Sequence, residues 1–158
     1  MISATHKSPI GTLTLVSDGK AIVYLEFENN KYPAPKYPRG TDKIIEQAKK
    51  ELDAYFAGKL KDFKVPVRPQ GTAFQEAAWK ALTKIPYGVT RSYGDQARAI
   101  GKPKAVRAIG AANGRNPIPI IIPCHRVIGA NGSLTGFGGG METKQFLLEL
   151  EQGQQLLR

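Results

Sequence analysis

A stretch with two prolines and a glycine, residues 65–71 (VPVRPQG), divides the chain into parts with different hydrophobic patterns. Before it, residues 10–27 hold two runs rich in β-branched and aromatic residues around the turn sequence SDGK, which predicts a β-hairpin. After it, apolar residues recur mainly with helical spacing. The sequence therefore predicts an α/β (α+β) fold, with a small antiparallel-sheet domain at residues 1–70 and a mainly helical domain at residues 71–158.

The N-terminal part also contains a loop and a helix. Residues 29–40 carry three prolines and a glycine and are expected to form a loop. Residues 41–56 keep a helical period, with Thr41 as the predicted cap and Gly58 as the predicted end. The linker at residues 65–71 then separates this unit from the C-terminal part.

The C-terminal part contains a predicted helix-turn-helix. A first helix begins at Thr72 and stops at Pro86. A short helix then begins at Ser92 with a capping-box pattern, and the next opens at Pro103 and runs to about residue 114. Two short helices joined by GKP are typical of a helix-turn-helix. The composition of the second suits a DNA recognition helix, and it also suits an ordinary helix packed by its alanines. A last helix is predicted at residues 142–151, burying its apolar residues Phe146, Leu147 and Leu150.

The chain is strongly basic, with a formal net charge of +10. The excess is densest from Lys80 to Arg126, where nine Lys and Arg residues face a single acid, Asp95. Such a surface attracts polyanions, and it is equally compatible with a plain solubilising role.

The only cysteine, Cys124, lies in the segment NPIPIIIPCHRVIG directly before His125. A free thiol has a pKa of about 8.5, so a nucleophilic role needs a nearby base or positive charge. On a regular strand the two side chains would point to opposite faces, so His125 reaches the sulfur only if the chain turns after Pro123, or through a water. The alternative is a small buried hydrophobe, which is the commonest role of a lone cysteine.

Two further features favour a functional site at Cys124. The glycines at 136 and 138–140 would let a ligand approach the backbone closely. A catalytic histidine usually needs an orienting acid, and either Glu149 or Glu151 of the last helix could supply it.

Composition excludes several classes of protein. No run of eighteen apolar residues exists, and the N-terminus lacks the pattern of a secretory signal, so neither a membrane span nor export is expected. A single cysteine allows no internal disulfide, which fits a reducing cytosol. One cysteine and two histidines also exclude a Cys/His-rich zinc site, so we expect no metal and no cofactor.

Taken together, FQEAAWKAL, the stretch from IPYGVTRSYGDQA to NPIPIIIPCHRVIG, and GSLTGFGGGMETKQFLLELE resemble the O6-alkylguanine-DNA alkyltransferase family. The resemblance is strong over about residues 72–151, and residues 1–70 match only in outline. It implies a direct-reversal DNA-repair enzyme, a methylated-DNA–protein-cysteine methyltransferase, with a ribonuclease H-like supporting domain at residues 1–70. An alkyl group would pass irreversibly from O6-alkylguanine to the protein, once per molecule.

The resemblance also implies roles for individual residues. Cys124 would accept the alkyl group, His125 would act as its base through a water, and Glu151 would orient His125. Asn116 would brace the acceptor segment, and Tyr93 would help to rotate the nucleotide and donate a proton. Arg107 would enter the duplex from the minor groove. Further DNA contacts are expected from Gly94, Lys102, Lys104, Ala105, Ala108 and Arg126.

The substrate would be double-stranded DNA, since an alkylated guanine must be flipped out of the stack before a protein can reach it. We expect a cytoplasmic, nucleoid-associated monomer, with cooperative binding and repair of O4-alkylthymine left open. Phe137-Gly138 stands where some family members carry a hydroxyl, so stabilisation of the leaving group would rely more on backbone N–H groups. The alternatives are a non-catalytic protein that binds alkylated DNA, a helix-turn-helix regulator, and a cysteine hydrolase.

Overall fold

A computed structural model describes residues 1–134, 137 and 140–156, and the side chains among these up to residue 153. Its N-terminal part is an antiparallel sheet of three strands in the order β1 (Ile2–Ser8), β2 (Gly11–Ser17) and β3 (Ile22–Glu26). The predicted hairpin corresponds to β2 and β3 and is confirmed. The strand β1 was not predicted, because its sequence ISATHKS has little apolar character and its residues are only half-buried or exposed at the sheet edge.

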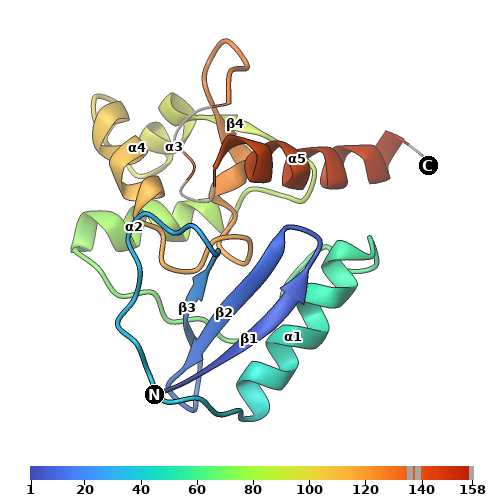
Figure 1. Cartoon of the computed structure of the whole chain (residues 1–158). Coiled ribbons are helices and arrows are strands. Elements are labelled where there is room, and N and C mark those ends of the chain that lie inside the picture. Colours follow the sequence, from blue (N-terminus) through green and yellow to red (C-terminus); the bar gives the residue numbers. More distant parts are fainter. Residues whose placement is uncertain (135–136, 138–139, 157–158) are drawn as a thin grey trace.

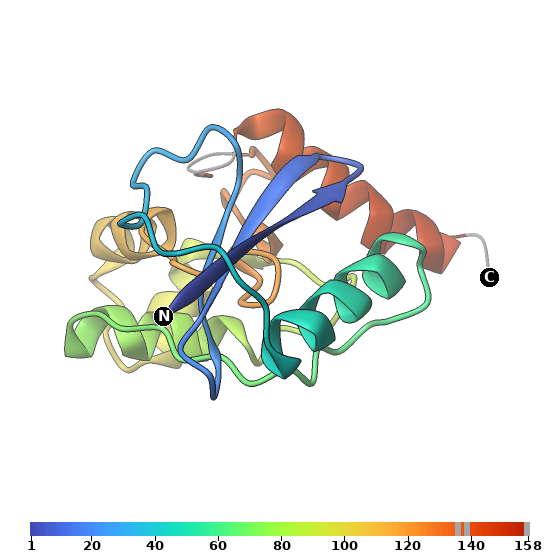
Figure 2. The ribbon, with the colours of Figure 1, turned by 60° about the horizontal axis from the view of Figure 1, so that its bottom comes forward.

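Helix α1 (Lys43–Phe56) packs against the sheet, as Figures 1 and 2 show. Asp42, and not the predicted Thr41, caps it by accepting a hydrogen bond from the Ile45 amide. Thr41 instead donates to Glu46. Gly58, at φ +74°, lies just beyond the helix end, as predicted.

The predicted linker is part of the fold. The amide of Ile22 donates to the Pro66 carbonyl at 2.8 Å, and the amide of Arg68 donates to the Ile22 carbonyl at 2.9 Å. This stretch therefore runs alongside the start of β3 and forms only an isolated bridge there, between Val67 and Ile22. Its prolines are tolerated because this position does not require every backbone N–H to donate to a neighbouring strand. It crosses from one part of the chain to the other along the sheet.

The C-terminal part contains the predicted helices with some altered ends. They are α2 (Ala73–Leu82), α3 (Tyr93–Ala99), α4 (Val106–Gly114) and α5 (Met141–Leu156), with short parallel strands β4 (Arg91–Ser92) and β5 (Val127–Ile128). Capping boxes are present at Thr72 and Ser92, and α3 and α4 pack together as a helix-turn-helix. Helix α2 ends before the predicted Pro86, and α4 begins three residues after Pro103, at a start without a side-chain cap.

One hydrophobic core runs through both parts of the chain. It joins sheet residues such as Leu13 and Leu25 to Tyr55 of α1 and to Trp79 and Ile118 of the C-terminal part. In Figure 1 the sheet and α1 form the lower layer, and α5 crosses above them. Contrary to expectation, Phe146 of α5 is not buried: it is 37% exposed and lies beside Phe56. Within the described residues, no helix combines the length and apolar character that crossing a membrane requires.

Candidate active site

The backbone before Cys124 is bent in an unusual way. Ile120 has φ +73°, a left-handed conformation that costs a β-branched residue about 1–3 kcal/mol. After Pro123 the chain turns into a short 3₁₀ segment, η1 (Cys124–Arg126). The chain therefore turns directly after Pro123, which is one of the two conditions under which His125 could reach the sulfur.

Asn116 fixes this bent segment from the side. Its amide nitrogen donates to the Ile122 carbonyl at 2.7 Å, and its amide oxygen accepts from the Ile118 backbone at 3.0 Å. Asn116 also hydrogen-bonds Cys124, which lowers the pKa of the thiol in opposition to burial. Asn116 therefore lies next to the sulfur and is hydrogen-bonded to the backbone of the segment before Cys124.

Glu151 of α5 is the centre of a buried hydrogen-bond network. Its carboxylate accepts from His125 Nε2 at 2.7 Å, from Tyr55 Oη at 2.7 Å and from the Gly88 amide at 3.1 Å. Two nitrogens of Arg126 complete the set at 2.9 and 3.1 Å. Burial alone would raise the pKa of Glu151, but His125 and Arg126 outweigh it and hold the pKa at about 2. Of the two acids left open by the sequence, Glu151 contacts His125, whereas Glu149 is exposed and contacts Gln145.

His125 is buried and neutral at physiological pH. Burial lowers its pKa, and the favourable contact with Glu151 only partly opposes this effect. Because the ionised carboxylate can only accept, Nε2 carries the ring proton and Nδ1 is left with a free lone pair. Among the described residues, Nδ1 is a buried side-chain atom without a hydrogen-bond partner. Such an atom is a proton acceptor held ready at low dielectric.

Cys124 is a resting thiol in this environment. Burial raises its pKa to about 11, although Asn116 and the charge of Lys144 act in the opposite direction. Lys144 is itself almost fully buried on α5, and its Nζ lies 5.8 Å from the centre of the Tyr93 ring. Helix α5 thus carries a cation near Cys124 and, two turns later, an anion at His125.

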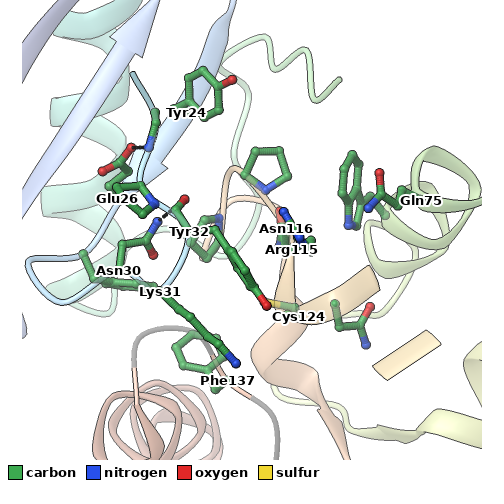
Figure 3. A pocket seen from close by; sticks show the side chains of 18 of the residues that line it. Tyr24, Glu26, Asn30, Lys31, Tyr32, Gln75, Arg115, Asn116, Cys124 and Phe137 are labelled. Carbon is green, nitrogen blue, oxygen red and sulfur yellow. Dashed lines mark hydrogen bonds between the residues drawn. The ribbon is translucent and has the colours of Figure 1, made fainter. Parts of the chain in front are cut away.

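A cavity of about 260 Å³ opens beside Cys124 and is lined from both parts of the chain. Figure 3 shows Cys124 and Asn116 on one side, with Tyr32 of the N-terminal part reaching across it and Phe137 nearby. The sulfur therefore faces a space that a small group can enter. Of the glycine-rich loop, residues 136, 138 and 139 lie outside the described residues, so the expectations for those glycines and for Phe137-Gly138 as a pair stay predictions.

The predicted DNA-contacting residues of the helix-turn-helix lie mostly on the surface. Arg107 and Ala108 are exposed on α4, Lys102 and Lys104 are exposed before it, and Ala105 is half-buried. Tyr93 and Gly94 are half-buried in the first turn of α3.

Arg126 does not fit its predicted contact with DNA. Its side chain is almost fully buried, and the guanidinium donates to Glu151 and to the Ile85 carbonyl at 2.7 Å. A buried carboxylate needs a paired cation, and Arg126 satisfies that need. We therefore assign Arg126 to the network around Glu151.

Sequence reasoning missed two members of this site. Tyr55 lies 96 residues from Glu151 along the chain, and no local pattern indicates their contact. Lys144 could have been found, because it lies seven residues before Glu151 and so on the same face of α5. A lysine on a buried helix face is uncommon enough to be noticed.

Two family models match the chain. The ribonuclease-like domain of 6-O-methylguanine DNA methyltransferase matches residues 1–69, and the DNA binding domain of the same family matches residues 73–153. The chain is 50% identical to a methylated-DNA–protein-cysteine methyltransferase of Methanosarcina acetivorans over 153 residues, covering 96% of this chain and 98% of the relative. A protein of the same name from Haemophilus influenzae is 47% identical over 93% of this chain and 84% of that protein. Among solved structures, Mycobacterium tuberculosis OGT in complex with DNA superposes with a TM-score of 0.92 at 48% identity, covering 98% of this chain and 94% of that one.

Proposed function

Because the chain belongs to the 6-O-methylguanine DNA methyltransferase family and is an alkyl-transfer DNA-repair protein, we propose that Cys124 is its alkyl acceptor. The observation that carries this proposal is the buried hydrogen bond between Glu151 and His125 Nε2. It leaves Nδ1 of His125, the residue directly after Cys124, without a hydrogen-bond partner and able to accept a proton. The substrate is O6-alkylguanine in double-stranded DNA.

The first step is removal of the thiol proton. With a pKa of about 11, the thiol is ionised in only about one molecule in ten thousand at pH 7. His125 Nδ1 takes this proton through a bridging water, and the resulting imidazolium is stabilised by the carboxylate of Glu151. Lys144 supports the thiolate with its charge.

The thiolate then attacks the alkyl carbon. A carbon–sulfur bond forms, the bond from that carbon to guanine O6 breaks, and the electron pair goes to guanine. Tyr93 supplies a proton to the leaving guanine. The product is a thioether without a carbonyl for water to attack, so Cys124 is not regenerated and each molecule acts once.

DNA binding places the lesion at this site. The exposed Arg107 and the small residues of α4 suit binding in the minor groove. A protein can read little of the base sequence from this groove, which suits repair of a lesion that can occur at any guanine. Arg107 fills the gap left by the flipped nucleotide. Lys102 and Lys104 contact phosphates, and the protein acts as a monomer on chromosomal DNA, which places it at the nucleoid.

The test is a single-turnover reaction with duplex DNA that carries one O6-methylguanine. The intact mass is expected to rise by one methyl group, the modified peptide to contain Cys124, and the DNA to regain guanine. Repeated turnover would indicate a hydrolase instead. An unmodified Cys124 in protein that binds the DNA fully would refute the proposal and favour a non-catalytic binding protein or a regulator.

A further inference from the structure

We propose that Tyr32, from the segment between β3 and α1, sets the upper size of the alkyl group that Cys124 accepts. This inference rests on the proposed function. It assigns a specificity role to the N-terminal part of the chain, whose residues lie far in sequence from the acceptor.

The cavity is closed on one side by the N-terminal part. Tyr32 and Pro33 line it together with Cys124, Asn116 and Pro119. Figure 3 shows the side chain of Tyr32 directed across the cavity toward Cys124. In that view the hydroxyl end of Tyr32 points toward Cys124, so a group attached to the sulfur grows toward the Tyr32 side chain.

Tyr32 is held in place although it is partly exposed. The guanidinium carbon of Arg115, directly after α4, lies 3.9 Å from the ring centre, and Lys31 Nζ lies 5.5 Å from it. A cation so close to an aromatic face is attracted by the ring electrons. The side chain of Asn30 also donates to the Tyr32 carbonyl at 3.1 Å. The ring is thereby tied to the C-terminal part and cannot turn away without losing these contacts.

The neighbouring wall is also built across the two parts. The rings of Phe27 and Phe137 lie 5.6 Å apart, and both residues line the same cavity. Tyr32 and Phe137 also line a second, separate hollow along α4. Removing the Tyr32 ring would join the space beside Cys124 to this hollow and give a longer alkyl chain somewhere to go.

The experiment compares rates of transfer from two duplexes of identical sequence, one with O6-methylguanine and one with O6-benzylguanine. The ratio of the two rates cancels changes in DNA binding, which affect both substrates alike. A steric limit changes such ratios by about tenfold or more, so Tyr32→Ala is expected to raise the benzyl-to-methyl ratio about tenfold. Tyr32→Phe keeps the ring but removes the hydroxyl that points toward Cys124, so it is expected to raise the ratio by a smaller factor than Tyr32→Ala.

Two further variants sharpen the test. Arg115→Ala removes the cation that lies over the Tyr32 ring, and with it a side chain that also lines the cavity, and is expected to raise the ratio by a smaller factor. Tyr37→Ala changes a tyrosine on the same segment that does not line the cavity, and it is expected to leave both rates unchanged.

A wild-type benzyl-to-methyl ratio in Tyr32→Ala would overturn the proposal, whatever the result for Arg115→Ala. A lower ratio in Tyr32→Ala would also overturn it, because it would mean that the ring assists bulky groups. Failure of the wild-type protein to take even the methyl group would refute the proposed function instead.

Discussion

The carboxylate of Glu151 connects the proton-accepting histidine to the rest of the protein, so Glu151→Gln is the most informative single change. The folded pKa of about 2 against an ordinary value of 4.5 corresponds to about 3 kcal/mol of stability at neutral pH. Breaking a buried ion pair by removing one partner costs about 3–5 kcal/mol by general experience, so the two figures agree. We expect a loss in this range, because Arg126 is left buried without its counter-ion.

The expected loss has a defined pH dependence. Since the folded pKa is depressed, the stabilisation by Glu151 is fully present above pH 4.5 and disappears as the pH falls toward 2. At pH 3.5 about 1 kcal/mol of it should already be gone. The difference in unfolding free energy between wild type and Glu151→Gln should therefore shrink between pH 7 and pH 3.5.

The assay is urea unfolding followed by fluorescence of Trp79, the only tryptophan, which is buried and donates to the Ala112 carbonyl. In a thermal melt at pH 7, the melting temperature of Glu151→Gln should lie roughly 6–20 °C below that of the wild type. Glu149→Gln, on the exposed side of the same helix, is the matched control and should change stability by less than about 0.5 kcal/mol. A loss at pH 7 no larger than that of the control, or a difference between the variants that is constant with pH, would refute this account of the network.

Two further predictions concern the thiol and the DNA interface. The rate of Cys124 alkylation by iodoacetamide in the free protein should still be rising at pH 9, because burial raises the thiol pKa to about 11; a plateau near pH 7 would contradict this. Arg107→Ala should slow repair of duplex DNA at least tenfold and leave the reaction with free O6-benzylguanine base unchanged, with Lys50→Ala on the exposed side of α1 as control. Equal losses on both substrates would remove Arg107 from its role in the duplex.

Local signals in the sequence predicted local structure well. The helix start at Thr72 and the capping box at Ser92 were readable because a cap and its partners lie within three residues of each other, and the β2–β3 hairpin because its turn lies between its strands. Helix α4 was placed too early, since Pro103 is acceptable at a first helical position but does not oblige the helix to begin there. The strand β1 was missed because an edge strand needs little hydrophobic pattern of its own.

The site was predictable where its residues share the acceptor motif and unpredictable where they converge from afar. The turn after Pro123 entered only as a condition for His125 to reach the sulfur, and the role of Asn116 came only from the family resemblance; the structure contains both the turn and the hydrogen bond from Asn116 to the Ile122 carbonyl. Arg126 was misplaced on the DNA side because a basic residue in a basic region suggests a phosphate contact. Its true position depends on Glu151, which is 25 residues away and needs a buried partner.

The N-terminal part does more than support the C-terminal part. Tyr55 of α1 donates to the same oxygen of Glu151 that accepts from His125, so a residue of the first 70 helps to hold the partner of the proposed base. Tyr32 stacks with Arg115 beside the acceptor cavity, so the same region reaches the place where an alkyl group must fit. Both contacts cross the boundary that the sequence suggested between two domains, and the stretch at residues 65–71 is itself hydrogen-bonded to Ile22. The acceptor site is consequently a property of the whole fold, since one end of its proton chain and one wall of its cavity come from residues that no motif around Cys124 contains.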